Sequence, residues 1–100
     1  MLSGLSTQGE ILVDEGAATA LRQQHRSLLP AGVTEVVGSF GRGDIISIVD
    51  SGRVQMACGI SNYGSEDVDK IKGMHSGRIA ELLDQQYGEE VVHRNNMVIL

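Results

Sequence analysis

The stretch that decides the fold is residues 44–60, which read DIISIVDSGRVQMACGI. Its first part, Asp44 to Asp50, is a run of β-branched residues that favours a strand. Its last part predicts a second strand, because apolar residues occupy every other position, at Val54, Met56, Cys58 and Ile60. Ser51-Gly52 lies between the two parts and matches a two-residue hairpin turn. We therefore expect a β-hairpin here.

Further short strands are predicted on both sides of this hairpin. Residues 10–13 form a short apolar run rich in β-branched residues, and residues 33–40 are a second strand candidate. Residues 91–92 and 97–100 form apolar segments near the end of the chain. Residues 1–8 are small and polar, as in a linker or N-terminal tail. Several short strands with short helices predict a mainly β, α+β fold. The expected architecture is a small barrel or pseudo-barrel that forms a single domain over residues 9–100.

Three short helices are expected between the strands. Asp14 is a good N-cap for the first, which should run to about Gln24. The second is expected to begin with a serine cap at Ser65 and to end at Gly73. The third should begin at Ser76 and end at Gly88. Ile79, Leu82 and Leu83 should share one apolar face of this helix, because they have i, i+3, i+4 spacing.

Composition narrows the class of function. One hundred residues are the size of one small domain. The net charge is −5, which argues against strong non-specific nucleic-acid binding, because such binding needs clustered cations. Cys58 is the single cysteine, so a reducing cytoplasm is expected. The chain also has no apolar run long enough to span a membrane and no signal-peptide pattern at its N-terminus.

The motifs that suggest chemistry have simpler structural explanations. Residues 38–43, GSFGRG, lack the Gly-Lys-Ser/Thr ending of a P-loop and precede a strand, so we expect a tight β connection. His25, His75 and His93 have no second ligand at metal spacing, and we expect no metal site. Cys58 alternates with apolar residues and is expected to be a small core residue.

Five further motifs follow one another along the chain, at residues 10–17, 27–33, 38–44, 59–76 and 91–97. The first three resemble motifs of the PUA domain, a module named after pseudouridine synthases and archaeosine transglycosylases. The last two are more specific and resemble the C-terminal PUA domain of the bacterial glutamate 5-kinase family. Two positions depart from the family pattern: Asn95-Asn96 stands where acidic residues are usual, and Asp69 where a basic residue is common.

The resemblance implies a PUA pseudo-barrel without catalytic residues. It implies a parent enzyme that phosphorylates L-glutamate with ATP and Mg²⁺ in proline biosynthesis, through an N-terminal amino-acid-kinase domain. In that setting the present chain would modulate feedback regulation or assembly. Its partner would be the kinase domain of the same protein, with homo-oligomers as a further expectation.

RNA binding is the alternative that the resemblance leaves open, because PUA domains of tRNA-modifying enzymes bind RNA. In those relatives RNA lies along the first helix and the neighbouring strands. The corresponding positions give the candidate RNA-binding residues Gly16, Ala17, Arg22, Arg42 and Arg94. The two small residues would allow close backbone approach, and the arginines would meet phosphates.

Overall fold

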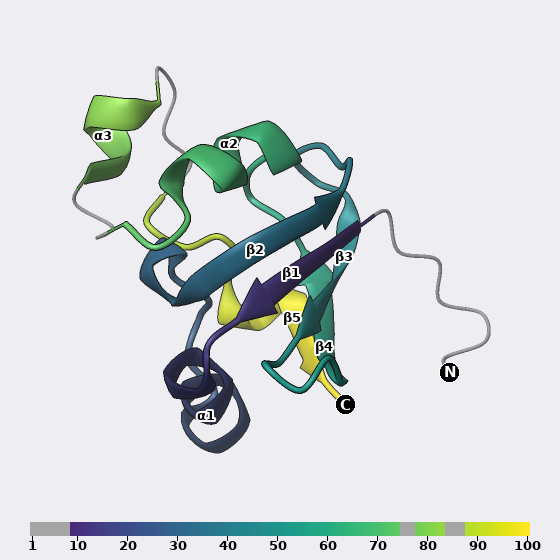
Figure 1. The fold of residues 1–100 in the computed structure, drawn as a ribbon. Coiled ribbons are helices and arrows are strands. Elements are labelled where there is room, and N and C mark those ends of the chain that lie inside the picture. Colours follow the sequence, from purple (N-terminus) through teal and green to yellow (C-terminus); the bar gives the residue numbers. More distant parts are fainter. Residues whose placement is uncertain (1–8, 75–77, 84–87) are drawn as a thin grey trace.

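The computed structural model describes residues 9–74, 78–83 and 88–100, and its centre is a five-stranded mixed sheet (Figure 1). The strand order is β2-β1-β3-β4-β5; β1 and β3 are parallel, and the other neighbours are antiparallel. The strands are β1 (Gly9–Val13), β2 (Val33–Gly38), β3 (Ile45–Val49), β4 (Gln55–Ile60) and β5 (Met97–Ile99). This sheet confirms the predicted mainly β, α+β class.

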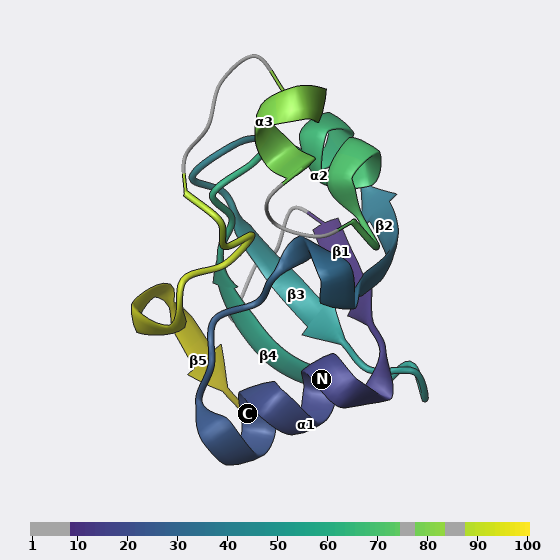
Figure 2. The ribbon, with the colours of Figure 1, turned by 90° about the vertical axis from the view of Figure 1, so that its left-hand side faces the viewer.

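Helices lie at both ends of the sheet. Figure 2 shows α1 at one end and α2 with α3 at the other. The α-helices are α1 (Glu15–Gln24), α2 (Ser65–Ile71) and α3 (Ile79–Leu82), and the 3-10 helices are η1 (Pro30–Gly32) and η3 (Arg94–Asn96). Within the described ranges, no helix has the length and apolar character needed to cross a membrane.

The core is largely aliphatic, as the scarcity of aromatic residues predicts. Alternation along β1 and β3 places Ile11, Ile46 and Ile48 on the inner face, where all three are fully buried. Tyr63 is the largest fully buried side chain, and its hydroxyl donates to the carbonyl of Gly88 at 2.6 Å. This bond satisfies the one polar atom that the ring carries into the interior.

The hairpin of β3 and β4 forms as predicted, but its turn is longer than two residues. Arg53 N donates to the Asp50 carbonyl at 3.0 Å, and Arg53 adopts a left-handed φ of 61°. Asp50 Oδ1 also accepts from the N–H groups of Gly52 and Val54, at 2.9 and 3.1 Å. The Asp50 carboxylate thus stabilises a wider loop, and the predicted two-residue turn is wrong.

The strict alternation predicted for β4 is also interrupted. The pairing register with β3 shifts by one residue between Ile48 and Val49, as it does at a β-bulge. As a result Met56 and Ala57 both belong to the main hydrophobic cluster, although they are neighbours in the sequence. Cys58 is buried, as expected, but it pairs with Ser47 and lies outside that cluster.

Two helix predictions need correction. The N-cap of α2 is Gly64, and Ser65 is the first helical residue; its Oγ accepts from Phe40 N at 3.2 Å instead of capping the helix. In α3, Leu83 is buried with Ile79, whereas Leu82 is 37% exposed. The helix has four residues, so its apolar face is narrower than the spacing predicts. The predicted start at Ser76 lies outside the described residues.

Gly59 marks the closest approach between β4 and the C-terminal segment. A Cβ at Gly59 would lie 2.7 Å from the Asn96 carbonyl oxygen and 2.8 Å from Val92 Cγ1. We expect Gly59→Ala to lower the free energy of unfolding by about 1–3 kcal/mol, because the backbone must shift. Gly41→Ala is the matched control, since its Cβ would meet only Asp44 Oδ2 at 3.7 Å. Urea unfolding measures both variants, and equal losses would contradict this prediction.

Candidate interaction groove beside helix α1

The amino end of α1 is fixed by the predicted cap. Asp14 Oδ1 accepts from Ala17 N at 2.7 Å, and Asp14 N donates to the Gly32 carbonyl at 3.0 Å. A Cβ at Gly32 would lie 2.5 Å from Ala17 Cβ, so the absence of a side chain there lets η1 approach the helix. Ala18 and Leu21 anchor the other side of α1 in the core.

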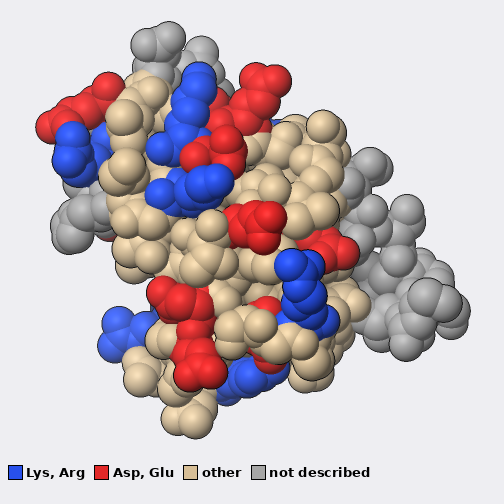
Figure 3. Space-filling model, viewed as in Figure 1, with Lys and Arg blue, Asp and Glu red and all other residues tan. Residues whose placement is uncertain are grey.

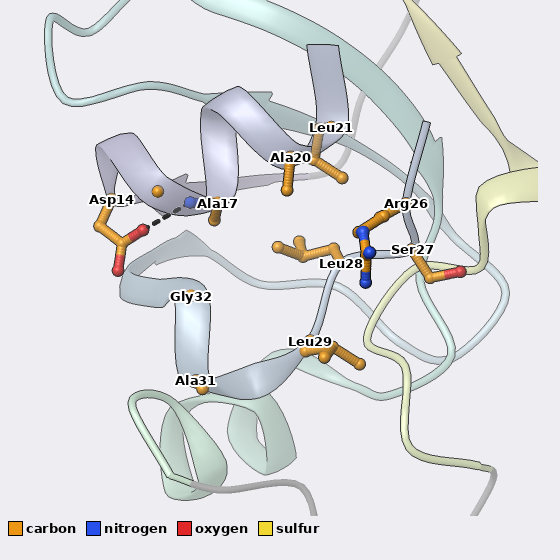
Figure 4. Close-up of a pocket in the computed structure, with 11 residues that line it drawn as sticks. Asp14, Ala17, Ala20, Leu21, Arg26, Ser27, Leu28, Leu29, Ala31 and Gly32 are labelled. Carbon is orange, nitrogen blue, oxygen red and sulfur yellow. Dashed lines mark hydrogen bonds between the residues drawn. The ribbon is translucent and has the colours of Figure 1, made fainter. Parts of the chain in front are cut away.

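A groove lies between α1 and the segment that leads through η1 to β2 (Figure 4). Its volume is about 290 Å³, close to the lower end of the range for ligand sites. Small and aliphatic side chains form most of its wall, with Asp14 at one end and Arg26 at the other (Figure 4). The lining residues are Asp14, Gly16, Ala17, Ala20, Leu21, Arg26, Ser27, Leu28, Leu29, Ala31 and Gly32.

A second hollow adjoins the Arg26 end of this groove. It has a volume of about 320 Å³ and is lined by Arg26, Ser27, Leu29, Glu90, His93 and Arg94. Arg94 N donates to Ser27 Oγ at 2.9 Å, which attaches η3 to the segment after α1. Arg26 and Arg94 therefore face a shared region, and no described residue forms an ion pair with either guanidinium.

The structure brings only part of the predicted RNA-binding set together. Gly16 and Ala17 line the groove, and Arg94 lines the adjoining hollow. Arg22 lines neither, because its Nη2 pairs with Asp50 Oδ2 at 2.9 Å. Arg42 lies in the β2–β3 connection at the α2 end of the sheet, where the neighbouring Gly43 N donates to the Ser61 carbonyl. It is therefore remote from the groove.

The predicted set omits most of the lining residues, among them Arg26, Ser27 and His93. Ser27 lies within one of the quoted motifs, but nothing in its local pattern indicates that its hydroxyl accepts from Arg94 N across 67 positions. His93 Nδ1 accepts from Asn95 N at 3.1 Å and caps η3. Among the residues that the structure describes, no three His, Cys, Asp or Glu side chains are grouped as a metal site would require.

Three hydrogen-bond donors surround the carboxylate of Asp50. The N–H of Val54, the Arg22 guanidinium and the N–H of Gly52 together lower the pKa of this carboxyl, against a smaller opposing effect of burial. Its side chain is 16% exposed. The same carboxylate thus holds the hairpin turn and ties that turn to α1.

The chain belongs to the PUA domain family, whose model matches residues 9–83. The glutamate 5-kinase of Dehalococcoides mccartyi strain CBDB1 is 51% identical over all 100 residues, and that of Shewanella halifaxensis is 50% identical. In both cases the chain spans 27% of the length of the relative. These matches confirm the resemblance that the five motifs predict.

Solved structures agree with the fold. A PUA domain from Aeropyrum pernix K1, solved as a tartrate complex, is 29% identical with a TM-score of 0.63. The match covers 86% of this chain and 41% of that one. An archaeal box H/ACA sRNP Nop10-Cbf5 complex matches with a TM-score of 0.56 at 16% identity, over 61% of this chain and 19% of that one. At that identity the likeness establishes the fold alone.

We expect Asp50→Asn to lower the melting temperature near neutral pH, because the neutral amide cannot hold both Arg22 and the turn. The pKa of Asp50 is lowered on folding. The stabilisation is therefore fully present above the unfolded value of about 3.9 and lost as the pH falls through the folded pKa. Thermal melts of wild type and variant from about pH 7 to about pH 2.5 should converge at the acid end.

Asp69→Asn is the matched control for this experiment. Asp69 pairs with Lys72 at 2.6 Å, but the carboxylate is 59% exposed, and such surface pairs contribute little. A separation between Asp50→Asn and wild type that stays constant down to the acid end would contradict the role given to the Asp50 carboxylate.

Proposed function

We propose that the chain is the non-catalytic C-terminal PUA domain of a glutamate 5-kinase, covering residues 9–100 after a linker of residues 1–8. The observation that carries this proposal is the identity of 51% along the whole chain to one such kinase. The chain spans 27% of that relative, so most of the longer protein lies outside it. The parent enzyme would act in the cytoplasm and transfer phosphate from ATP, with Mg²⁺, to L-glutamate.

In this proposal the phosphoryl transfer belongs to an amino-acid-kinase domain that precedes residue 1. The PUA domain modulates feedback inhibition by proline, or the assembly of the enzyme, through contact with that kinase domain. The surface supports a protein partner: Figure 3 shows acidic and basic side chains interspersed over one face, without a continuous basic stripe. Salt bridges such as Arg22–Asp50 and Arg78–Glu81 neutralise several of the cations locally.

Deletion of residues 9–100 from the full-length protein tests this function. We expect glutamate-dependent kinase activity to remain, since its residues lie in the other domain. Either of two properties should change. The proline concentration that gives half inhibition should shift by about fivefold or more, which is the low end of usual allosteric coupling. Alternatively, the oligomeric state of the enzyme should change. Steady-state kinetics and light scattering give the two readouts, with the undeleted enzyme as control. Unchanged kinetics together with unchanged assembly would refute the proposal.

RNA binding is the rival function, and a titration separates it from the first. The described cations do not form one track, because Arg42 lies far from the groove and Arg22 pairs with an acid. We therefore expect no binding of a structured RNA to the full-length protein, even at low salt. The measurement is a titration at two salt concentrations. Binding whose affinity falls steeply with salt would favour the RNA-binding function instead.

A further inference from the structure

We propose that the exposed face of the sheet near Gly9 is the docking surface for the domain that precedes this one in the longer polypeptide. This inference rests on the proposed function, because it requires such a preceding domain. Four aliphatic side chains form the surface, which we call the entry patch: Val37, Ile45, Ile60 and Val98.

The strand register places these four side chains on one face. One row crosses all five strands in the order Val37, Glu10, Ser47, Cys58 and Val98. Ile45 pairs with Ile60 two residues further along, on the side of Gly9. Since side chains alternate along a strand, both rows face away from the fully buried Ile46 and Ile48.

The face is covered at one end and exposed at the other. Near α1, Leu12 and Val49 lie on this same face and are 8% and 5% exposed. At the end of the sheet near Gly9, the residues Ile45 and Ile60 are 41% and 40% exposed. Val37 and Val98 lie on the two edge strands and are 41% and 61% exposed, whereas Ser47 and Cys58, between them in the same row, are 7% and 6% exposed. Ile45, Ile60 and Val98 lie on the neighbouring strands β3, β4 and β5, and exposed aliphatic residues grouped in this way are the kind of apolar surface that marks an interaction site.

The position of the patch identifies its occupant. The described part of the chain enters the sheet through β1, which lies between β2 and β3 (Figure 1), and Glu10 of β1 pairs with Val37 on one side and with Ser47 on the other. Eight linker residues can span at most about 28 Å. Nearly three quarters of each relative lies outside the matched part. A large preceding domain is thus tethered beside the patch, and docking onto it would bury these side chains at little cost in linker entropy.

The groove beside α1 is less suited to this occupant. Helix α1, which forms one wall of the groove, lies beyond the carboxyl end of β1, at the opposite end of the sheet from Gly9 (Figures 1 and 2). The entry patch, in contrast, adjoins the tether directly. To reach the groove, the linker would have to be extended along the length of β1, which costs more linker entropy than docking beside Gly9.

Thiol labelling of the full-length protein tests the docking surface. Ile60→Cys places a thiol in the entry patch, and Val54→Cys places one just before the same strand, at a site that is 58% exposed. Mass spectrometry of the labelled peptides follows each site separately. We expect the Ile60→Cys site to react about tenfold more slowly than the Val54→Cys site, and the difference to vanish in urea. If Ile60→Cys fails to fold, Val37→Cys tests the same patch.

Two results would overturn the inference. Labelling rates within about threefold of each other would show that nothing covers the patch in the native protein. Slow labelling that depends on protein concentration, with the introduced thiols cross-linking two chains, would mean that a second copy covers it instead.

The outcome is separable from that of the deletion experiment. In one case the Ile60→Cys site labels slowly, and deletion of residues 9–100 leaves proline inhibition and assembly unchanged. This result would support the docking surface and refute the regulatory role. Equal labelling with altered inhibition would keep the regulatory role and refute this surface.

Discussion

The backbone bridge between Leu28 and Val92 is the contact on which the rest of the structure depends. Leu28 N donates to the Val92 carbonyl at 2.9 Å, and Val91 N donates to the Leu28 carbonyl at 2.7 Å. All three side chains are essentially fully buried. The bridge joins the segment after α1 to the segment before β5, so it holds the far wall of the groove and turns an open sheet into a pseudo-barrel.

Two glycines make this closure possible. Gly32 lets η1 pack against Ala17, and Gly59 lets the C-terminal segment cross β4. Both positions would place a Cβ well inside van der Waals contact with a neighbour. Since neither has a positive φ, the requirement is for close approach rather than for an unusual backbone conformation. The groove thus depends on the close approach at Gly32, and the packing of the C-terminal segment against β4 depends on the close approach at Gly59.

Local chemistry explains which parts of this fold could be predicted from the sequence. The strands, the Asp14 cap and the helix stop at Gly73 follow from patterns within a few residues, and the structure contains them. The bulge that turns Met56 into the core depends on pairing with β3, and the wider turn depends on the Asp50 carboxylate. Gly16 and Ala17 are candidates only through the resemblance to PUA domains, and they do line the groove. The distance of Arg42 from the groove depends on the path of the β2–β3 connection, which no local pattern indicates.

The molecule has two separate faces, and their separation bears on how the domain works. The entry patch adjoins the tether, whereas the groove with Arg26 and Arg94 lies at the α1 end of the sheet. A domain held by its entry patch leaves that groove accessible to solvent. Strand β1 joins the two faces, because it runs from Gly9, beside the entry patch, to Val13, next to the Asp14 cap of α1. β1 is thus a direct covalent link between the two faces.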